Sequence, residues 1–282
     1  MKRNSRTLKG LALGVAVCAM AGTGVAEACS VAAWTAGNTT AAAANAGSPP
    51  TFRRYYGLCG LTVSAASPVV VGDNSPAGAA ETTYRSRFYF YTGLTAGSAV
   101  VFRASASDDN GGAEVLSLNY SSTGSLAYSV GGSTVATATG LAANKWYAVE
   151  ISYVGGATYS ISVRGNQTYT FSNNGATAFN TGIGSHTLGI VSNTGAAGSI
   201  QFDEFEASRA TTAIGFYPRG NARVDGTGAI ADQNYDIFDF IDAARELQTA
   251  VLASGNSDAD EDGDVDVFDI IAIARRVQLG SF

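Results

Sequence analysis

Several residue types are scarce in this 282-residue sequence, and each scarcity excludes a class of site. Its one histidine, His186, cannot form a metal site that needs several histidines. Basic residues number 17 against 23 acidic ones, and no basic patch is present, so we expect no nucleic-acid partner. Beyond the N-terminus no apolar run is long enough to span a membrane, so we expect no integral membrane segment after signal cleavage.

The N-terminus has the three parts of a secretory signal. Basic residues lie within 2–9, an apolar stretch covers 11–21, and Ala26-Glu27-Ala28 is a small-x-small cleavage site. We therefore predict a signal peptide over residues 1–28 and a protein that is secreted or held at the cell surface. A lipoprotein signal also ends before a cysteine, so lipidation of Cys29 is the alternative.

Cysteine is nearly absent from the exported part of the chain. Cys18 is removed with the signal, which leaves Cys29 and Cys59. An even pair in an oxidising compartment predicts one disulfide, which would tie an N-terminal segment, residues 29–50, to the first core strand. Two free thiols are the alternative.

Residues 258–269 have the layout of an EF-hand calcium loop. Aspartates stand at positions 1, 3, 5, 9 and 12, with Gly263 at the turn and the backbone carbonyl of Asp264 at position 7. So many carboxylates repel one another unless a cation neutralises them, and a hard divalent ion such as Ca²⁺ is the expected cofactor. A solvated acidic loop is the alternative. The candidate ligands are Asp258, Asp260, Asp262, Asp264, Asp266 and Asp269.

The helix expected after this loop has a copy earlier in the chain. Residues 236–248 and 266–278 are identical at seven of thirteen positions, which indicates two copies of one loop–helix unit. We expect each helix to bury an apolar face against the other. The predicted faces are Phe240, Ala244, Leu247 and Val251 in the first copy, and Val267, Ile270, Ile271, Ala274 and Val277 in the second.

The first loop is a weaker metal site than the second. Shifting the ligand positions back by 30 residues puts Gly228 and Ile230 at the first two ligands and Gln233 at the turn glycine. Asp225 is close enough in sequence to substitute for a lost ligand. The ligands that remain are Asp232, Asn234, Asp236 and Asp239, so we expect one good site and one weak or inactive one.

Negative charge is concentrated in the same region. From residue 220 onward there are 13 acidic and 4 basic residues, a net charge of −9, whereas residues 29–219 hold nine of each. The acidity of the whole chain is therefore a property of its C-terminal part.

The middle of the chain, residues 51–210, reads as many short strands. Runs of alternating apolar and polar residues recur between glycine-rich breaks, with hardly any helical periodicity. The expected strands are 84–91, 99–104, 114–120, 125–130, 145–153, 158–163 and 199–207. We predict a mainly β fold, an antiparallel jelly-roll sandwich, followed by a small α-helical EF-hand-like module.

This stretch resembles the laminin-G-like branch of the concanavalin A-like lectin/glucanase superfamily. The segments that carry the resemblance are 84–90, 144–150 and 200–206. It implies a module that binds a glycan or a cell-surface protein, and it makes Asp203 a further candidate calcium ligand. Within residues 84–91, Phe88 and Phe90 share one strand face and Tyr89 and Tyr91 the other, so the two tyrosines are candidates for stacking on a sugar.

No catalytic constellation is visible in the sequence. Glycanases of this superfamily place paired carboxylates on a Glu-x-Asp-x-x-Glu strand, which neither the segment at Glu150 nor residues 203–206 reproduces. His186 follows a glycine-rich turn and reads as an ordinary loop residue, and no nucleophile motif surrounds Ser185. We therefore expect that the chain is not an enzyme.

Residues 218–280 resemble the dockerin type I family, through their paired loop–helix units with aspartate at position 12. The resemblance implies a calcium-folded module that docks onto a cohesin domain. Positions 10 and 11 hold Ile237-Phe238 and Val267-Phe268 where many dockerins carry polar recognition residues.

The predicted organisation is a jelly roll over 51–210, a linker over 211–220 and a dockerin-like module over 221–280. The predicted function is that of an exported calcium-binding protein with a lectin-like binding or adhesion domain. Docking to a cohesin-type scaffold and polysaccharide degradation are the alternatives.

Overall fold

The computed structural model describes residues 36–37, 44–45, 55–57, 60–74, 81–107, 112–166, 168–173, 181–223 and 235–279. The predicted signal peptide and the predicted Cys29–Cys59 disulfide lie outside these residues. Within them, no helix has both the length and the apolar character needed to cross a membrane.

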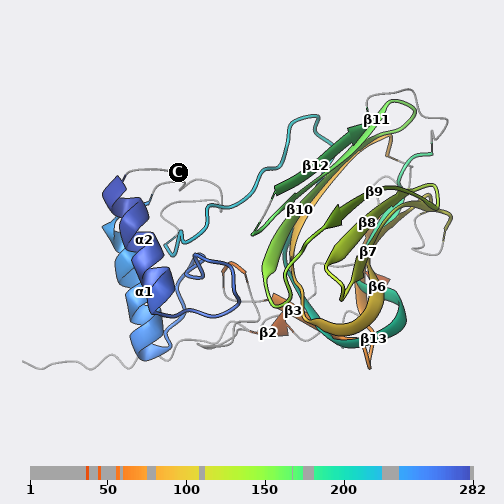
Figure 1. Cartoon of the computed structure of the whole chain (residues 1–282). Coiled ribbons are helices and arrows are strands. Elements are labelled where there is room, and N and C mark those ends of the chain that lie inside the picture. Colours follow the sequence, from red (N-terminus) through yellow and green to blue (C-terminus); the bar gives the residue numbers. More distant parts are fainter. Residues whose placement is uncertain are drawn as a thin grey trace, which may run out of the picture.

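The described residues between 36 and 208 form a jelly-roll sandwich of two antiparallel sheets (Figure 1). The front sheet runs in the order β2 (Ala44–Asn45), β3 (Gly60–Ser64), the second half of β13, β5 (Thr83–Tyr91), β10 (Trp146–Val154), β11 (Thr158–Arg164) and β12 (Thr168–Asn173). The back sheet runs in the order β1 (Ala36–Gly37), β4 (Val70–Asn74), the first half of β13, β6 (Leu94–Ser105), β7 (Glu114–Ser121), β8 (Ser125–Val130) and β9 (Ser133–Thr139). The predicted fold class is confirmed.

The 24-residue strand β13 (Ser185–Ser208) joins the two sheets. Its pairing with β6 shifts register three times between Leu188 and Gly198, where the strand bends from one sheet to the other. The sequence prediction found only the second half of β13 and missed β1, β2, β3, β4, β9 and β12. His186 is consequently not a loop residue: it lies in β13, is 8% exposed, and its ring is 4.7 Å from that of Phe205.

The sandwich core follows from strand alternation. Phe88 and Phe90 of β5 and Val149 and Ile151 of β10 are fully buried between the sheets, as the alternating pattern predicts. Burying a side chain of this size contributes about 1.5–3 kcal/mol.

A second apolar cluster lies on the outer face of the front sheet, not between the sheets. It consists of Tyr55, Tyr56, Tyr89, Trp146, Ala148 and Tyr217, and we call it the aromatic cluster. Tyr55 stacks on Tyr89 at a centroid distance of 3.8 Å, and Tyr56 stacks on Tyr217 at 4.3 Å. The alternation of β5 predicts that Tyr89 lies on the face opposite Phe88 and Phe90. Its burial there requires another part of the chain to cover the outer face of the sheet.

The cover is supplied partly by the segment that the sequence assigned as a linker. Tyr217 donates its backbone N–H to the Tyr89 hydroxyl at 2.7 Å, and the N–H groups of Ile214 and Gly215 donate to Glu150 at 2.8 and 3.1 Å. Residues 211–220 therefore lie along the front sheet.

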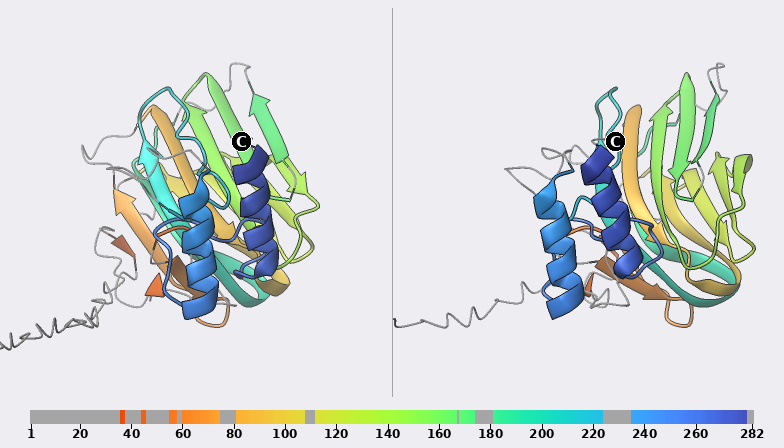
Figure 2. Two further views of the ribbon diagram at one scale, coloured as in Figure 1. Left: turned by 90° about the vertical axis from the view of Figure 1, so that its left-hand side faces the viewer. Right: turned by 60° about the vertical axis from the view of Figure 1, so that its left-hand side comes forward.

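The C-terminal module is a pair of helices, α1 (Ile237–Thr249) and α2 (Val267–Leu279), which stand side by side next to the front sheet (Figure 2). Asp236 caps α1: its side chain accepts from the Phe238 N–H, and the Asp239 side chain accepts from the Asp236 N–H. Both helices start where an acidic residue can satisfy the free N–H groups of the first turn.

The helices pack through a narrower face than the one predicted. Ala243 and Ile273 are fully buried at the centre, with Phe240, Ile270 and Val277 packed against them. Of the other predicted positions, Ala244 and Ala274 are half-buried. The remaining four are exposed: Leu247, Val251, Val267 and Ile271.

Candidate metal site and the front sheet face

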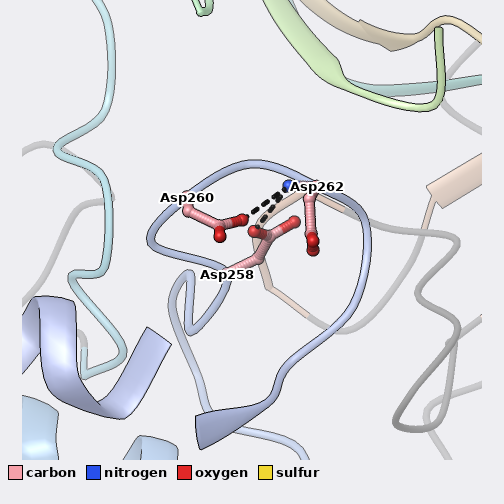
Figure 3. A group of neighbouring side chains, drawn as sticks. All are labelled: Asp258, Asp260 and Asp262. Carbon is pink, nitrogen blue, oxygen red and sulfur yellow. Dashed lines mark hydrogen bonds between the residues drawn. The ribbon is translucent and has the colours of Figure 1, made fainter. Parts of the chain in front are cut away.

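The loop between the helices brings its carboxylates together as the spacing predicts. Two groups each have ligand atoms within 4.8 Å of one another, Asp258 with Asp260 and Asp262, and Asp264 with Asp266 and Asp269. Each group could hold a metal ion. Figure 3 shows the first three side chains turned toward one another, with the Asp262 N–H donating to Asp258 and Asp260, both at 3.1 Å.

The two ends of the loop are buried, although both carry carboxylates. Asp258 is 5% exposed and Asp269 is 1% exposed. Asp258 accepts from the Gly263 N–H at 2.8 Å, and Asp269 accepts from the N–H groups of Ala259, Asp260 and Asp266 at 2.7, 3.2 and 2.8 Å. These backbone bonds close the loop around its acidic residues.

The electrostatics of the loop favour a cation. Burial, with Asp269 beside it, raises the pKa of Asp258 well above its ordinary value, and burial raises the pKa of Asp269 to about 6. Burial and the neighbouring Asp262 also raise the pKa of Asp264 to about 6. Ionised carboxylates are thus unfavourable here without a counter-charge, and one cation, Lys145, already lies 3.5 Å from Asp260 and 3.9 Å from Asp262.

The donor set fits a hard divalent ion. All six side chains offer oxygen, the ligand that Ca²⁺ and Mg²⁺ prefer, and Gly263 adopts φ +91° at the sharp turn.

The first loop differs from the second more than the sequence comparison indicated. Its candidates Asp232 and Asn234 lie outside the described residues, while Asp236 caps α1 and Asp239 is buried. Asp239 accepts from the Arg223 N–H at 3.0 Å, as Asp269 accepts from Ala259.

Two short segments hydrogen-bond to each other through their backbones, and each precedes one of the two loops in the sequence. They are Gly220-Asn221-Ala222 and Gly255-Asn256. Asn256 donates to the Asn221 carbonyl at 2.6 Å, and Gly255 donates to the Ala222 carbonyl at 2.9 Å. The Gly-Asn pairs are 35 residues apart (255 − 220), but the helices are 30 apart (267 − 237). The first loop is therefore five residues longer than the second. The repeated Gly-Asn was the sequence signal for this.

Within the described residues, Asp203 does not belong to either group of carboxylates that could hold a metal ion. Its carboxylate accepts from the N–H groups of Tyr55 and Tyr56, at 2.5 and 2.9 Å, and from Glu204 at 2.8 Å. It fixes the chain segment that carries two members of the aromatic cluster.

The tyrosines predicted to stack on a sugar are covered. Tyr89 is fully buried in the aromatic cluster, and its hydroxyl accepts from Tyr217. Tyr91 packs against loop 258–269: its hydroxyl donates to the Asp262 carbonyl at 3.4 Å, and burial raises the pKa of Tyr91 to about 12. Neither ring is an open platform.

The uncovered part of the front sheet is a shallow groove of about 410 Å³ over β10, β11 and β12. Two polar rows cross these strands: Ser152, Ser160 and Ser172 form one, and Glu150, Ser162 and Thr170 the other. Arg85 lies 3.7 Å from Glu150 and donates to the Thr211 carbonyl at 2.6 Å. The groove is therefore rich in hydroxyl groups and nearly balanced in charge.

Two acidic residues in the second half of β13, Glu204 and Glu206, lie next to Arg87. This arginine is buried, lies 3.2 Å from Glu206 and 4.0 Å from Glu204, and stacks over Tyr217 at 4.4 Å. Glu204 sits at a bulge with φ +50° and accepts from the Tyr217 hydroxyl at 2.8 Å. These carboxylates hold residues 211–217 against the sheet.

A smaller cavity of about 100 Å³ is lined by residues of β4, the start of β5 and the two ends of β13. Its wall includes Tyr84, His186 and the ion pair between Glu81 and Arg209, whose atoms are 2.6 Å apart. Burial lowers the pKa of His186 to about 4, so its imidazole is neutral at physiological pH.

The sequence matches no protein-family model and no curated protein. Among solved structures, the chain is similar to alginate lyase A1-II' of polysaccharide lyase family 7, at 16% identity, over 56% of this chain and 84% of the lyase, with a TM-score of 0.41. It is also similar to a Trypanosoma rangeli sialidase mutant with trans-sialidase activity, at 17% identity over 51% of this chain and 25% of that one, with a TM-score of 0.35.

A third similar structure is the ligand-binding domain of botulinum neurotoxin serotype D in complex with N-acetylneuraminic acid. It shares 10% identity over 53% of this chain and 38% of that one, with a TM-score of 0.39. None of these three structures bears out the dockerin resemblance, which stays a prediction.

The prediction that this chain is not an enzyme, which rested on the lack of a recognisable catalytic motif in the sequence, was wrong. Two of the three similar structures are enzymes and the third is a binding domain. The sandwich itself does not decide between catalysis and binding, so the side chains on its surface must decide it.

Proposed function

We propose that this chain is an exported carbohydrate-binding protein whose C-terminal module is held in shape by a calcium ion in loop 258–269. The observation that carries the calcium part is the burial of Asp258 and Asp269 at the two ends of a loop with four further aspartates. A divalent cation removes the repulsion among these groups and replaces their lost hydration. The signal-like residues 1–28 support export to a compartment where calcium is abundant.

The groove on the front sheet is the proposed glycan site. Its volume of about 410 Å³ lies within the usual range for ligand sites, roughly 300–1,000 Å³. Serine and threonine hydroxyls both donate and accept, so they suit the hydroxyl groups of a sugar. Because Arg85 and Glu150 nearly cancel, a neutral glycan fits better than a strongly charged one.

Filling the groove should weaken this binding. Ser160 lies at the middle of its polar row, opposite Ser152 on one side and Ser172 on the other. We expect Ser160→Tyr to weaken binding of neutral glycans by at least about tenfold on a glycan array, a loss of about 1.4 kcal/mol. The matched control is Ser129→Tyr, which adds the same ring to β8 of the back sheet.

Two outcomes would change the assignment. Equal binding by both variants would move the glycan site away from the groove. Release of new reducing ends or unsaturated sugars by the wild type, but not by Ser160→Tyr, would make the groove the site of a polysaccharide-degrading enzyme.

A second candidate function is docking to a cohesin-type partner through the helix pair. The repeat places exposed apolar residues at equivalent positions of α1 and α2: Ile237 and Val267, Phe238 and Phe268, Ile241 and Ile271. Exposed apolar patches of this kind are typical of interaction sites.

If docking occurs there, we expect Phe238→Asp with Phe268→Asp to abolish capture of a cohesin domain. The matched control is Leu279→Asp, which places the same charge at an exposed apolar position outside the repeated set. Surface plasmon resonance against an immobilised cohesin domain, with calcium present, measures this. Absence of wild-type capture would remove the candidate.

A further inference from the structure

The metal loop also contacts the sandwich, through a residue that is not a metal ligand. Glu261 lies between Asp260 and Asp262, is 2% exposed, and adopts a left-handed backbone conformation with φ +61°. Its carboxylate accepts from the Tyr55 hydroxyl at 2.9 Å and pairs with Arg219 at 2.9 Å. A left-handed backbone at glutamate is costly unless such contacts hold it in place.

The backbone carbonyls of Glu261 and of the residue after it are bonded to the front sheet. The Trp146 N–H donates to the Glu261 carbonyl at 2.9 Å, which extends the hydrogen bonding of β10 onto the loop. The Tyr91 hydroxyl donates to the next carbonyl, that of Asp262. Lys145 adds its contacts with Asp260 and Asp262 at the edge.

The same contacts cover the aromatic cluster. Trp146 lies on the outer face of β10, yet it is fully buried, with Tyr55 and Tyr91 at ring distances of 5.6 and 5.5 Å. Tyr55, which stacks on Tyr89, is in turn hydrogen-bonded to Glu261. Without the loop, the side of this cluster formed by Trp146 and Tyr55 would face solvent.

We propose that loop 258–269 is a metal-controlled latch: the bound cation sets the backbone path of residues 258–263, and Glu261 then locks the C-terminal module onto Tyr55, Arg219 and Trp146. The latch rests on the proposed metal binding. When the cation leaves, repulsion among the aspartates opens the loop. The hydrogen bonds from the Asp262 and Gly263 N–H groups to Asp258 are lost as Asp258 moves away from them. The aromatic cluster is then exposed, and the module and the sandwich no longer unfold as one unit.

Glu261 is a positioning residue in this scheme. It contributes no oxygen at a ligand position of the loop, and its carboxylate oxygens contact Tyr55 and Arg219. A change at Glu261 should therefore separate docking from metal binding, which a change at any aspartate ligand cannot do.

Trp146 is the natural probe, since the chain has only two tryptophans. In the full chain with Trp34→Phe, we expect calcium to give a blue-shifted Trp146 emission, and a chelator to shift it to the red and raise acrylamide quenching by about threefold. Calorimetry on the same samples measures calcium binding independently.

We expect Glu261→Gln to bind calcium within about threefold of the wild-type affinity, because it is not a ligand, and to leave Trp146 open to quenching with or without calcium. The matched control, Asp242→Asn, removes one charge from α1 without touching the loop and should respond as the wild type does. Far-UV circular dichroism confirms that each variant is folded.

Two results would overturn the latch in different ways. If calcium binds but Trp146 is equally protected with and without it, the loop is a metal site that does not control docking, and the proposed function stands. If calorimetry shows no calcium binding, the proposed calcium role fails and the latch fails with it.

Discussion

Asp258→Asn is expected to weaken calcium binding by on the order of 100-fold, equivalent to about 2.7 kcal/mol. Asp258 occupies position 1 of the loop and is almost fully buried beside Asp269. Its carboxylate supplies both a ligand oxygen and a negative charge, and the amide keeps the shape but loses the charge. Titration calorimetry on the full chain measures the loss, with Asp242→Asn as the control.

The same substitution should have the opposite effect when calcium is absent. Burial and Asp269 raise the pKa of Asp258 well above its ordinary value, so its ionised form destabilises the metal-free fold at neutral pH. The neutral amide removes that penalty. We therefore expect Asp258→Asn to raise the melting temperature in chelator and to lower it in calcium. A variant less stable than wild type under both conditions would contradict the electrostatic role.

Gly263→Ala is expected to destabilise the docked module by about 2–5 kcal/mol in total. Gly263 has φ +91°, which strains any residue with a Cβ, and a Cβ there would lie 2.4 Å from a carbon of the Tyr91 ring. Either the loop or the ring must move, and Tyr91 is already packed against Trp146. Thermal unfolding in calcium measures the loss.

Two variants separate the strain from the clash. Gly195→Ala also places a Cβ at positive φ, +60°, but with no atom within 4 Å, so it should cost only the strain, about 1–2 kcal/mol. Adding Tyr91→Ala to Gly263→Ala should recover part of the remainder. If Gly263→Ala lowers the free energy of unfolding no more than Gly195→Ala does, the close contact between the loop and Tyr91 that the structure shows is contradicted.

Local patterns made much of this molecule predictable from its sequence. The alternation in residues 84–91 correctly places Phe88 and Phe90 on one strand face, which proves to be the core face, and Tyr89 on the other. The aspartate spacing in residues 258–269 brings the carboxylates into two close groups. Both features depend on neighbours within one strand or one loop, where a period or a spacing is sufficient.

The features that sequence patterns missed depend on distant contacts. Tyr89 looked like an open platform because nothing in its strand reveals that Tyr217 and Tyr55 cover it. Glu261 looked like one more acid in a charged loop, but its partners Tyr55 and Arg219 lie 206 and 42 residues away (261 − 219). The first half of β13 was missed because Gly189 and His186 interrupt its apolar pattern. The strand β12 was also missed, although its residues alternate in burial as a strand's do.

Calcium in loop 258–269 is the central claim, and titration calorimetry of the chelator-treated full chain with Ca²⁺ and with Mg²⁺ tests it most directly. We expect calcium to bind with a Kd on the order of 10⁻⁴ M or tighter, magnesium to bind more weakly, and Asp258→Asn to remove the calcium signal. No heat of calcium binding, or a calcium isotherm that Asp258→Asn leaves unchanged, would contradict the claim.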